Sequence, residues 1–273
     1  MSKNKTLIIV GMGRSGTSLT ASWLRSCGLH MGSDFGKTQT GNVKGSWEDQ
    51  EIRKVHSAIL KENSVKSWIG VNNKEIFFPR HLIQQSKKII NKKNTDHEQW
   101  GFKDPLSALV IKEWHKLIPG AEFLFVYRNY NLTVDSIKRM EQKIQKTRRN
   151  KIAGMINSIL WKFNFKDEAK FQNKCLTAWK RYNFELLDYF KKNEITFTIV
   201  NASELSIKAE NIIKVLNQKG FDLNYNSLDK VFDSSIYNKN DVKLDSRNSG
   251  LIEECELLYQ QLEQESKLFS VNV

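Results

Sequence analysis

The chain alternates short apolar runs with longer stretches of helical periodicity, a pattern typical of a parallel α/β sheet. The short runs are rich in β-branched and aromatic residues, and most lack the alternation of a half-exposed strand. Continuous apolar runs of this length are expected for strands that are buried on both faces. The predicted strands are Thr6–Val10, Gln99–Lys103, Glu122–Tyr127 and Ile195–Val200.

Apolar residues at helical spacing predict helices between and after these strands. These helices cover Thr17–Cys27, Glu48–Lys61, Leu106–Leu117, a stretch from Leu132 into a basic run, Phe171–Lys191 and Ser206–Lys219. We expect one α/β domain over residues 1–273, with a central parallel sheet and flanking helices. It would include a basic helical insertion at about 138–170 and a C-terminal amphipathic helix at about 249–269.

The composition is that of a globular protein with a basic surface. Of 273 residues, 40% are hydrophobic, and 43 Lys and Arg against 30 Asp and Glu leave a net charge of +13. Such a surface favours anionic partners. No nucleic-acid-binding motif is recognisable, so we do not expect nucleic acid among them. Three Pro and 14 Gly exclude a collagen-like or low-complexity chain.

Cysteine usage and the hydropathy pattern predict a cytoplasmic protein. Cys27, Cys175 and Cys255 are far apart, form no CxxC pair and have no zinc-site spacing, which fits a reducing compartment. We recognise neither a signal peptide nor an apolar run long enough to span a bilayer.

The strongest local motif is a glycine-rich loop after the first predicted strand. The loop Gly11–Ser18 reads Gly-Met-Gly-Arg-Ser-Gly-Thr-Ser and leads into a predicted helix. Glycines permit the tight turn, and the backbone N–H groups at a helix start bind anions. A phosphate group suits this position.

The loop has the glycine spacing of a Walker A motif but lacks its lysine. Thr17 stands where the lysine should follow Gly16. The strands that should carry a Mg²⁺-binding Asp end instead in Arg128 and Asn201. The pattern therefore favours a nucleotide that is used without a metal ion, and ordinary ATP hydrolysis is not expected.

These residues resemble the sulfotransferases that use 3′-phosphoadenylyl sulfate (PAPS). Gly11–Ser18 is similar to their 5′-phosphosulfate loop, and Arg14–Thr17 especially to the tyrosylprotein and bacterial branches. Arg128 at a strand end, followed eight residues later by Ser136, resembles their 3′-phosphate site. Bidentate binding by a guanidinium suits such a phosphate.

A third element, Trp100–Leu106, resembles the Lys-Asp-Pro motif of tyrosylprotein sulfotransferases. Its Lys103 matches their catalytic lysine, while Pro105 stands where cytosolic sulfotransferases have a catalytic His. Gly45–Asp49 lies where the tyrosylprotein and some bacterial enzymes place a catalytic Glu. The resemblance extends with specific motifs over about residues 6 to 140.

The resemblance implies PAPS as co-substrate, adenosine 3′,5′-bisphosphate as product, no metal, and a set of site residues. Arg14 and Lys103 would stabilise the leaving phosphate, and Glu48 would be the base, with Asp49, Asp104 and His56 as alternatives. The residues expected to bind PAPS are Gly13, Arg14, Ser15, Gly16, Thr17, Ser18, Arg128 and Ser136.

The implied reaction is in-line transfer of a sulfuryl group to a hydroxyl or amine. The acceptor class stays open between a small molecule, a glycan and a lipid-linked molecule, and the basic charge fits an anionic one. Two alternatives remain: a P-loop kinase-like phosphotransferase that uses ATP, and a non-catalytic nucleotide- or anion-binding protein of the same fold. The sequence does not indicate an oligomeric state.

Overall fold

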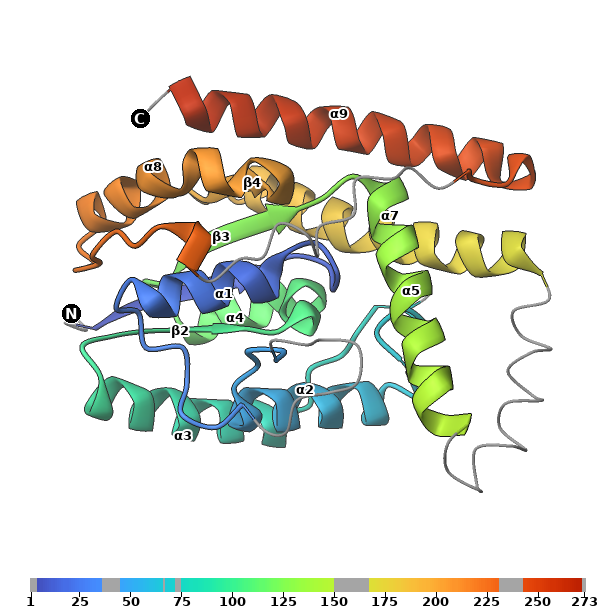
Figure 1. Ribbon diagram of the computed structural model, residues 1–273. Coiled ribbons are helices and arrows are strands. Elements are labelled where there is room, and N and C mark those ends of the chain that lie inside the picture. Colours follow the sequence, from blue (N-terminus) through green and yellow to red (C-terminus); the bar gives the residue numbers. More distant parts are fainter. Residues whose placement is uncertain are drawn as a thin grey trace.

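The core of the molecule is a parallel sheet. The structure is a computed structural model, which describes residues 4–35, 45–65, 67–71, 75–149, 167–230 and 243–271. Within these ranges four parallel strands pair in the order β2-β1-β3-β4 (Figure 1). The expected central parallel sheet with flanking helices is confirmed. The strands are β1 (Lys5–Val10), β2 (Gln99–Lys103), β3 (Glu122–Tyr127) and β4 (Thr198–Asn201).

The helices follow the predicted order with one addition. The region predicted as one helix at Leu106–Leu117 is a 3₁₀ segment followed by a short α-helix, and the helix Arg80–Asp96 was not expected. The helical elements are α1 (Thr17–Ser26), α2 (Gln50–Glu62), α3 (Arg80–Asp96), η1 (Pro105–Val110), α4 (Ile111–Leu117), α5 (Tyr130–Arg149), α7 (Glu168–Lys192), α8 (Leu205–Gln218) and α9 (Ser249–Val271).

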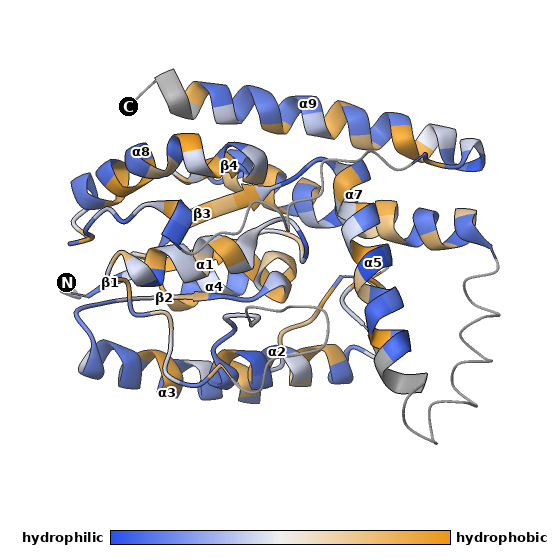
Figure 2. Ribbon diagram, in the orientation of Figure 1, coloured by the Kyte–Doolittle hydropathy of each residue, from blue (hydrophilic) through white to orange (hydrophobic). Residues whose placement is uncertain are grey.

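Alternate residues of each strand pack against different helix layers. In β1, Leu7 and Ile9 pack with residues of α1 and α8, whereas Ile8 and Val10 pack with residues of α2, α3, α4, α7 and α9. Because both faces are covered, the strands are apolar along their length, as the orange colour of β3 in Figure 2 shows.

The strand register brings the ends of β1, β2 and β3 to one edge of the sheet. Ile9 pairs with Lys103, and Val10 pairs with Phe125, two residues before the end of β3. The loop after β1, Lys103 and the start of α5 therefore meet at this edge. In Figure 1, α5 lies across the end toward which β3 points. Open α/β sheets bind ligands at this edge.

The expected basic insertion is only partly covered by the structure. Its first residues belong to α5, where Lys138 pairs with Glu168 at 2.7 Å and Arg139 pairs with Asp135 at 2.7 Å. Residues 150–166 lie outside the described ranges. None of the helices in those ranges has an apolar stretch long enough to cross a membrane.

Gly11 is the position where a side chain is least tolerable. A Cβ atom there would lie 2.1 Å from the carbonyl oxygen of Val126, and its φ is +146°. We expect Gly11→Ala to lower the free energy of unfolding by at least about 3 kcal/mol, since backbone would have to shift. Gly120→Ala is the control: no atom lies within 4 Å of the added Cβ. Chemical denaturation should show a loss below about 0.5 kcal/mol there, and equal losses in both variants contradict this prediction.

A stacked histidine pair beside β2 makes stability depend on pH. His30 bridges to Trp100, and its ring lies 3.5 Å from the ring of His97. Burial lowers the pKa of His30 below its usual 6.5, and neighbouring His97 and Lys93 lower it further. Just below pH 6.5 the unfolded chain therefore binds more protons than the folded protein, so stability falls as the pH falls. His30→Asn removes the contribution of His30 to the pH dependence of stability. Its midpoint of chemical denaturation should therefore fall less steeply than that of wild type as the pH is lowered from about 7 to about 5. An unchanged slope contradicts the prediction.

Candidate active site

The glycine-rich loop presents an open helix N-terminus at the carboxyl edge of the sheet. Gly16 takes the N-cap position of α1 with φ +93°, and no side chain in the described part of the chain caps the helix. The first N–H groups of α1 therefore remain available to an anion. Arg14 has a φ of +73°. A non-glycine residue in this region costs on the order of 1 kcal/mol, and such strain is often found in ligand-binding loops.

A buried hydroxyl in the loop lacks a partner. The side-chain oxygen of Ser15 is fully buried and has no hydrogen-bond partner among the described residues. Buried polar atoms are nearly always paired, so an unpaired one in a turn of this kind indicates a missing acceptor or donor. A phosphate oxygen would satisfy the Ser15 hydroxyl. The loop thus fits the anionic group that the sequence motif implies.

Cationic side chains converge beside the loop. Arg14 Nε donates to the hydroxyl oxygen of Ser136 at 3.2 Å, which joins two residues assigned to opposite ends of PAPS. Burial lowers the pKa of Arg14, and repulsion from Arg128 and Arg139 lowers it further. The guanidinium groups still carry charge at neutral pH. Because their mutual repulsion is unfavourable, a bound phosphate dianion would stabilise the cluster.

The backbone around Arg128 is held by buried contacts. Trp179 on α7 donates its indole N–H to the carbonyl oxygen of Arg128 at 2.9 Å. The next residue, Asn129, accepts the N–H of Asn131 at 2.9 Å and so caps the start of α5. These contacts fix the turn from β3 into α5, which carries Ser136. The Arg128–Ser136 spacing read from the sequence therefore corresponds to a strand end and the helix that follows it.

Lys103 and Glu48 form an ion pair next to the loop. The Lys103 amine is 2.9 Å from Glu48 Oε1, and Arg53 Nε lies 3.6 Å from the other carboxylate oxygen. Lys103 is 2% exposed. The hydroxyl of Ser18 donates to the carbonyl oxygen of Ser46 at 3.0 Å, which ties the segment before Glu48 to the loop. The structure thus brings the Lys103–Glu48 ion pair next to the glycine-rich loop.

The other carboxylate candidate on the same segment, Asp49, caps a helix. One oxygen of Asp49 accepts the N–H of Glu51 at 2.9 Å and that of Ile52 at 3.3 Å, at the start of α2. The other oxygen is 2.7 Å from the amine of Lys93. Asp49 is 4% exposed. With its lone pairs engaged inside the protein, Asp49 has a structural role, and Glu48 is better placed for proton transfer.

The remaining base candidates, Asp104 and His56, face each other in the interior. His56 Nδ1 lies 3.2 Å from Asp104 Oδ2, and Trp114 donates to His56 Nε2 at 2.9 Å. The sequence analysis named Asp104 and His56 separately and did not predict that they contact each other. The sequence did indicate that His56 is buried, because it lies on the apolar face of its helix with Ile52 and Ile59.

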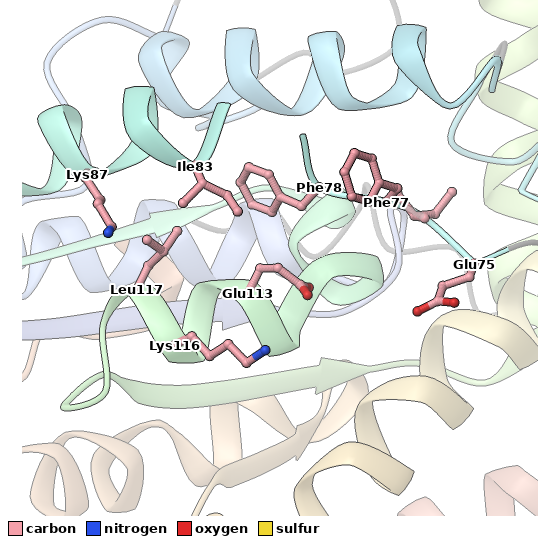
Figure 3. Close-up of a pocket in the computed structure, with 9 residues that line it drawn as sticks. Glu75, Phe77, Phe78, Ile83, Lys87, Glu113, Lys116 and Leu117 are labelled. Atoms are coloured by element: carbon pink, nitrogen blue, oxygen red, sulfur yellow. The ribbon is translucent and has the colours of Figure 1, made fainter. Parts of the chain in front are cut away.

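A separate cavity of about 560 Å³ lies on the layer formed by α3 and α4. In Figure 3, Phe77, Phe78 and Ile83 lie across from Glu113 and Leu117 on α4. None of the predicted site residues lines it. The cavity is therefore distinct from the loop at the carboxyl edge of the sheet.

Comparisons with known proteins support the fold. No family model matches the chain, and no curated protein matches it. Among solved structures, the sulfotransferase STF1 of Mycobacterium tuberculosis matches 92% of this chain and 76% of its own, with a TM-score of 0.50 at 11% identity.

Two further structures were found. The sulfotransferase STF9 of Mycobacterium avium has a TM-score of 0.47 at 10% identity and covers 96% of this chain and 76% of its own. The sulfotransferase domain of the Synechococcus PCC 7002 olefin synthase has a TM-score of 0.49 at 13% identity. This match covers 98% of this chain and 94% of that domain's chain. The chain has the sulfotransferase fold, as the likeness to STF1 shows, and the resemblance stated from the motifs is confirmed at the level of the fold.

Proposed function

We propose that this protein transfers a sulfuryl group from PAPS to a hydroxyl or amine acceptor. The observation that carries the proposal is the meeting of Arg14, Arg128 and Ser136 beside a loop whose buried Ser15 hydroxyl lacks a partner. A ligand with phosphates at both ends of an adenosine fits this arrangement. The fold, which is that of sulfotransferases, supports the same reaction class.

The loop and the arginine cluster would bind opposite ends of the nucleotide. The 5′-phosphosulfate would lie against the residues Gly13–Ser18, where backbone N–H groups and hydroxyls donate to it. Arg128 and Ser136 would bind the 3′-phosphate. Arg14 contacts Ser136 and belongs to the loop, so it can contribute at both places.

The transfer is an in-line displacement at sulfur. The bond from sulfur to the 5′-phosphate oxygen breaks, and a bond from sulfur to the acceptor oxygen or nitrogen forms. The acceptor proton passes to Glu48, and adenosine 3′,5′-bisphosphate leaves with its negative charge stabilised by Lys103 and Arg14. Preorganised charge of this kind usually lowers the barrier more than any other single effect in an active site. Groups on the protein supply each of these roles.

Ligand binding tests the donor half of the proposal. A thermal-shift comparison should show a higher melting temperature with adenosine 3′,5′-bisphosphate, with or without EDTA, and a smaller change with ATP and Mg²⁺. The reverse order would favour a phosphotransferase and contradict our assignment.

Transfer itself is tested with ³⁵S-labelled PAPS and acceptors from each class, namely alcohols, phenols, amines, glycans and lipid-linked alcohols. Label on an acceptor supports sulfuryl transfer and identifies the acceptor class. Tight nucleotide binding with no label transferred to any of them would instead favour a binding protein of this fold.

A further inference from the structure

Buried polar contacts join Trp114, His56 and Asp104, the residue that follows Lys103. Trp114 Nε1 donates to His56 Nε2 at 2.9 Å, and His56 Nδ1 lies 3.2 Å from Asp104 Oδ2. Asp104 Oδ1 accepts the N–H of Leu106 at 2.9 Å, at the start of η1. Trp114, His56 and Asp104 are at most 4% exposed. Polar groups buried this deeply are unfavourable without a partner nearby, and each of these three side chains faces another of the three.

The partners of His56 fix where its proton lies. An indole N–H can only donate, so His56 Nε2 must accept and the neutral ring carries its hydrogen on Nδ1. Asp104 Oδ2 lies 3.2 Å from that nitrogen. One ring nitrogen thus accepts from the indole and the other faces a buried carboxylate, so neither is open to an acceptor molecule. His56 does not fit the role of a general base.

Asp104 is held as a carboxylate beside Lys103. Burial by itself would raise the pKa of Asp104, but His56, the Leu106 N–H and Lys103 together hold that pKa below its usual range. The buried amine of Lys103 is 2.9 Å from Glu48 and also interacts electrostatically with Asp104, the next residue. Two carboxylates stabilise a charged amine in a place where burial disfavours it.

The same contacts fasten α2 to the end of β2. The consecutive residues Lys103 and Asp104 meet Glu48, just before α2, and His56, on its second turn. Trp114 on α4 supports the imidazole from the other side. A change in the His56–Asp104 contact therefore moves the two elements that carry Lys103 and Glu48.

We propose that His56 and Trp114 are positioning residues, which fix the Asp104 carboxylate at the end of β2 so that the Lys103 amine stays against Glu48 in the geometry for transfer. The inference deepens the proposed function and rests on it. Within the described residues, neither His56 nor Trp114 contacts Arg14 or Ser136, two of the groups proposed to bind the donor. Their substitution should therefore change kcat and leave KM for PAPS nearly unchanged.

Trp114→Phe is the most informative variant because it removes the N–H and keeps an aromatic ring. The imidazole of His56 then loses the donor that holds its Nε2 in place. We expect kcat about tenfold below wild type, with KM for PAPS nearly unchanged.

Two matched comparisons distinguish a positioning role from general destabilisation of the protein. Trp23→Phe removes an equivalent buried indole N–H, which donates to Asn226 at 2.8 Å in the other helix layer. It should lower stability and leave kcat near the wild-type value. His56→Asn keeps a donor near the Nδ1 position, whereas His56→Leu does not, so the Asn variant should retain the higher kcat.

The tautomer is measurable without any substrate. Imidazole ¹⁵N NMR of the full-length protein should show His56 with hydrogen on Nδ1. A wild-type ring with hydrogen on Nε2 overturns the inference. So does an active enzyme in which Trp114→Phe lowers kcat no more than Trp23→Phe does. A wild type that transfers no sulfuryl group instead refutes the proposed function, and the positioning role with it.

Discussion

Lys103→Met should lower kcat for sulfuryl transfer by about 10²- to 10³-fold, with only a small change in affinity for adenosine 3′,5′-bisphosphate. The Lys103 amine is buried at the end of β2 and is aimed at Glu48, beside the glycine-rich loop. Its positive charge is needed most when the 5′-phosphate leaves, because negative charge develops there in the transition state. Single-turnover transfer of label from PAPS measures the effect.

Lys219→Met is the control for loss of a lysine in an ion pair. Lys219 pairs with Glu122, the first residue of β3, which lies at the opposite edge of the sheet. This variant should turn over like wild type. Comparable losses in the two lysine variants would indicate general destabilisation, and an unaffected Lys103→Met enzyme would remove Lys103 from the chemistry.

Arg128→Met should weaken binding of adenosine 3′,5′-bisphosphate by about 10- to 100-fold. A charge-assisted hydrogen bond of a guanidinium to a phosphate contributes on the order of 1.5–3 kcal/mol. Arg128 follows β3 directly, and its backbone is fixed by Trp179, so the side chain starts from a defined position. Isothermal titration calorimetry gives the affinity.

Adenosine 5′-monophosphate serves as the matched ligand because it lacks only the 3′-phosphate. If Arg128 binds that phosphate, the monophosphate should bind wild type and Arg128→Met with nearly equal affinity. A loss of the same size for both nucleotides would show that Arg128 acts on the adenosine or on the fold, and the assignment to the 3′-phosphate would be wrong.

Local patterns were sufficient to predict most of the fold. The strands at Gln99–Lys103 and Glu122–Tyr127 lie where the apolar runs place them. The last strand begins at Thr198, three residues later than predicted, because a strand needs a neighbour to pair with and the ladder with β3 starts there. Helix α3 was missed because its buried face includes Ser86 and Lys93, which a search for apolar periodicity passes over.

The residues of the candidate site could be predicted from the sequence, but the contacts between them could not. The motifs singled out Glu48 and Lys103, which are 55 residues apart, yet only the folding of the segment before α2 against the end of β2 brings them to 2.9 Å. Asp49, next to Glu48 and chemically similar, caps α2 instead. Which of two adjacent carboxylates faces the lysine depends on where the helix begins, and the sequence left that open.

The gathering of Arg14, Arg128 and Arg139 also affects how the protein should be handled in solution. Like charges held close together attract small doubly charged anions, so we expect inorganic sulfate and phosphate to compete with the proposed nucleotide. If they do, the nucleotide affinity measured in such buffers will be lower than the true value. Chloride or acetate buffers of equal ionic strength avoid this competition.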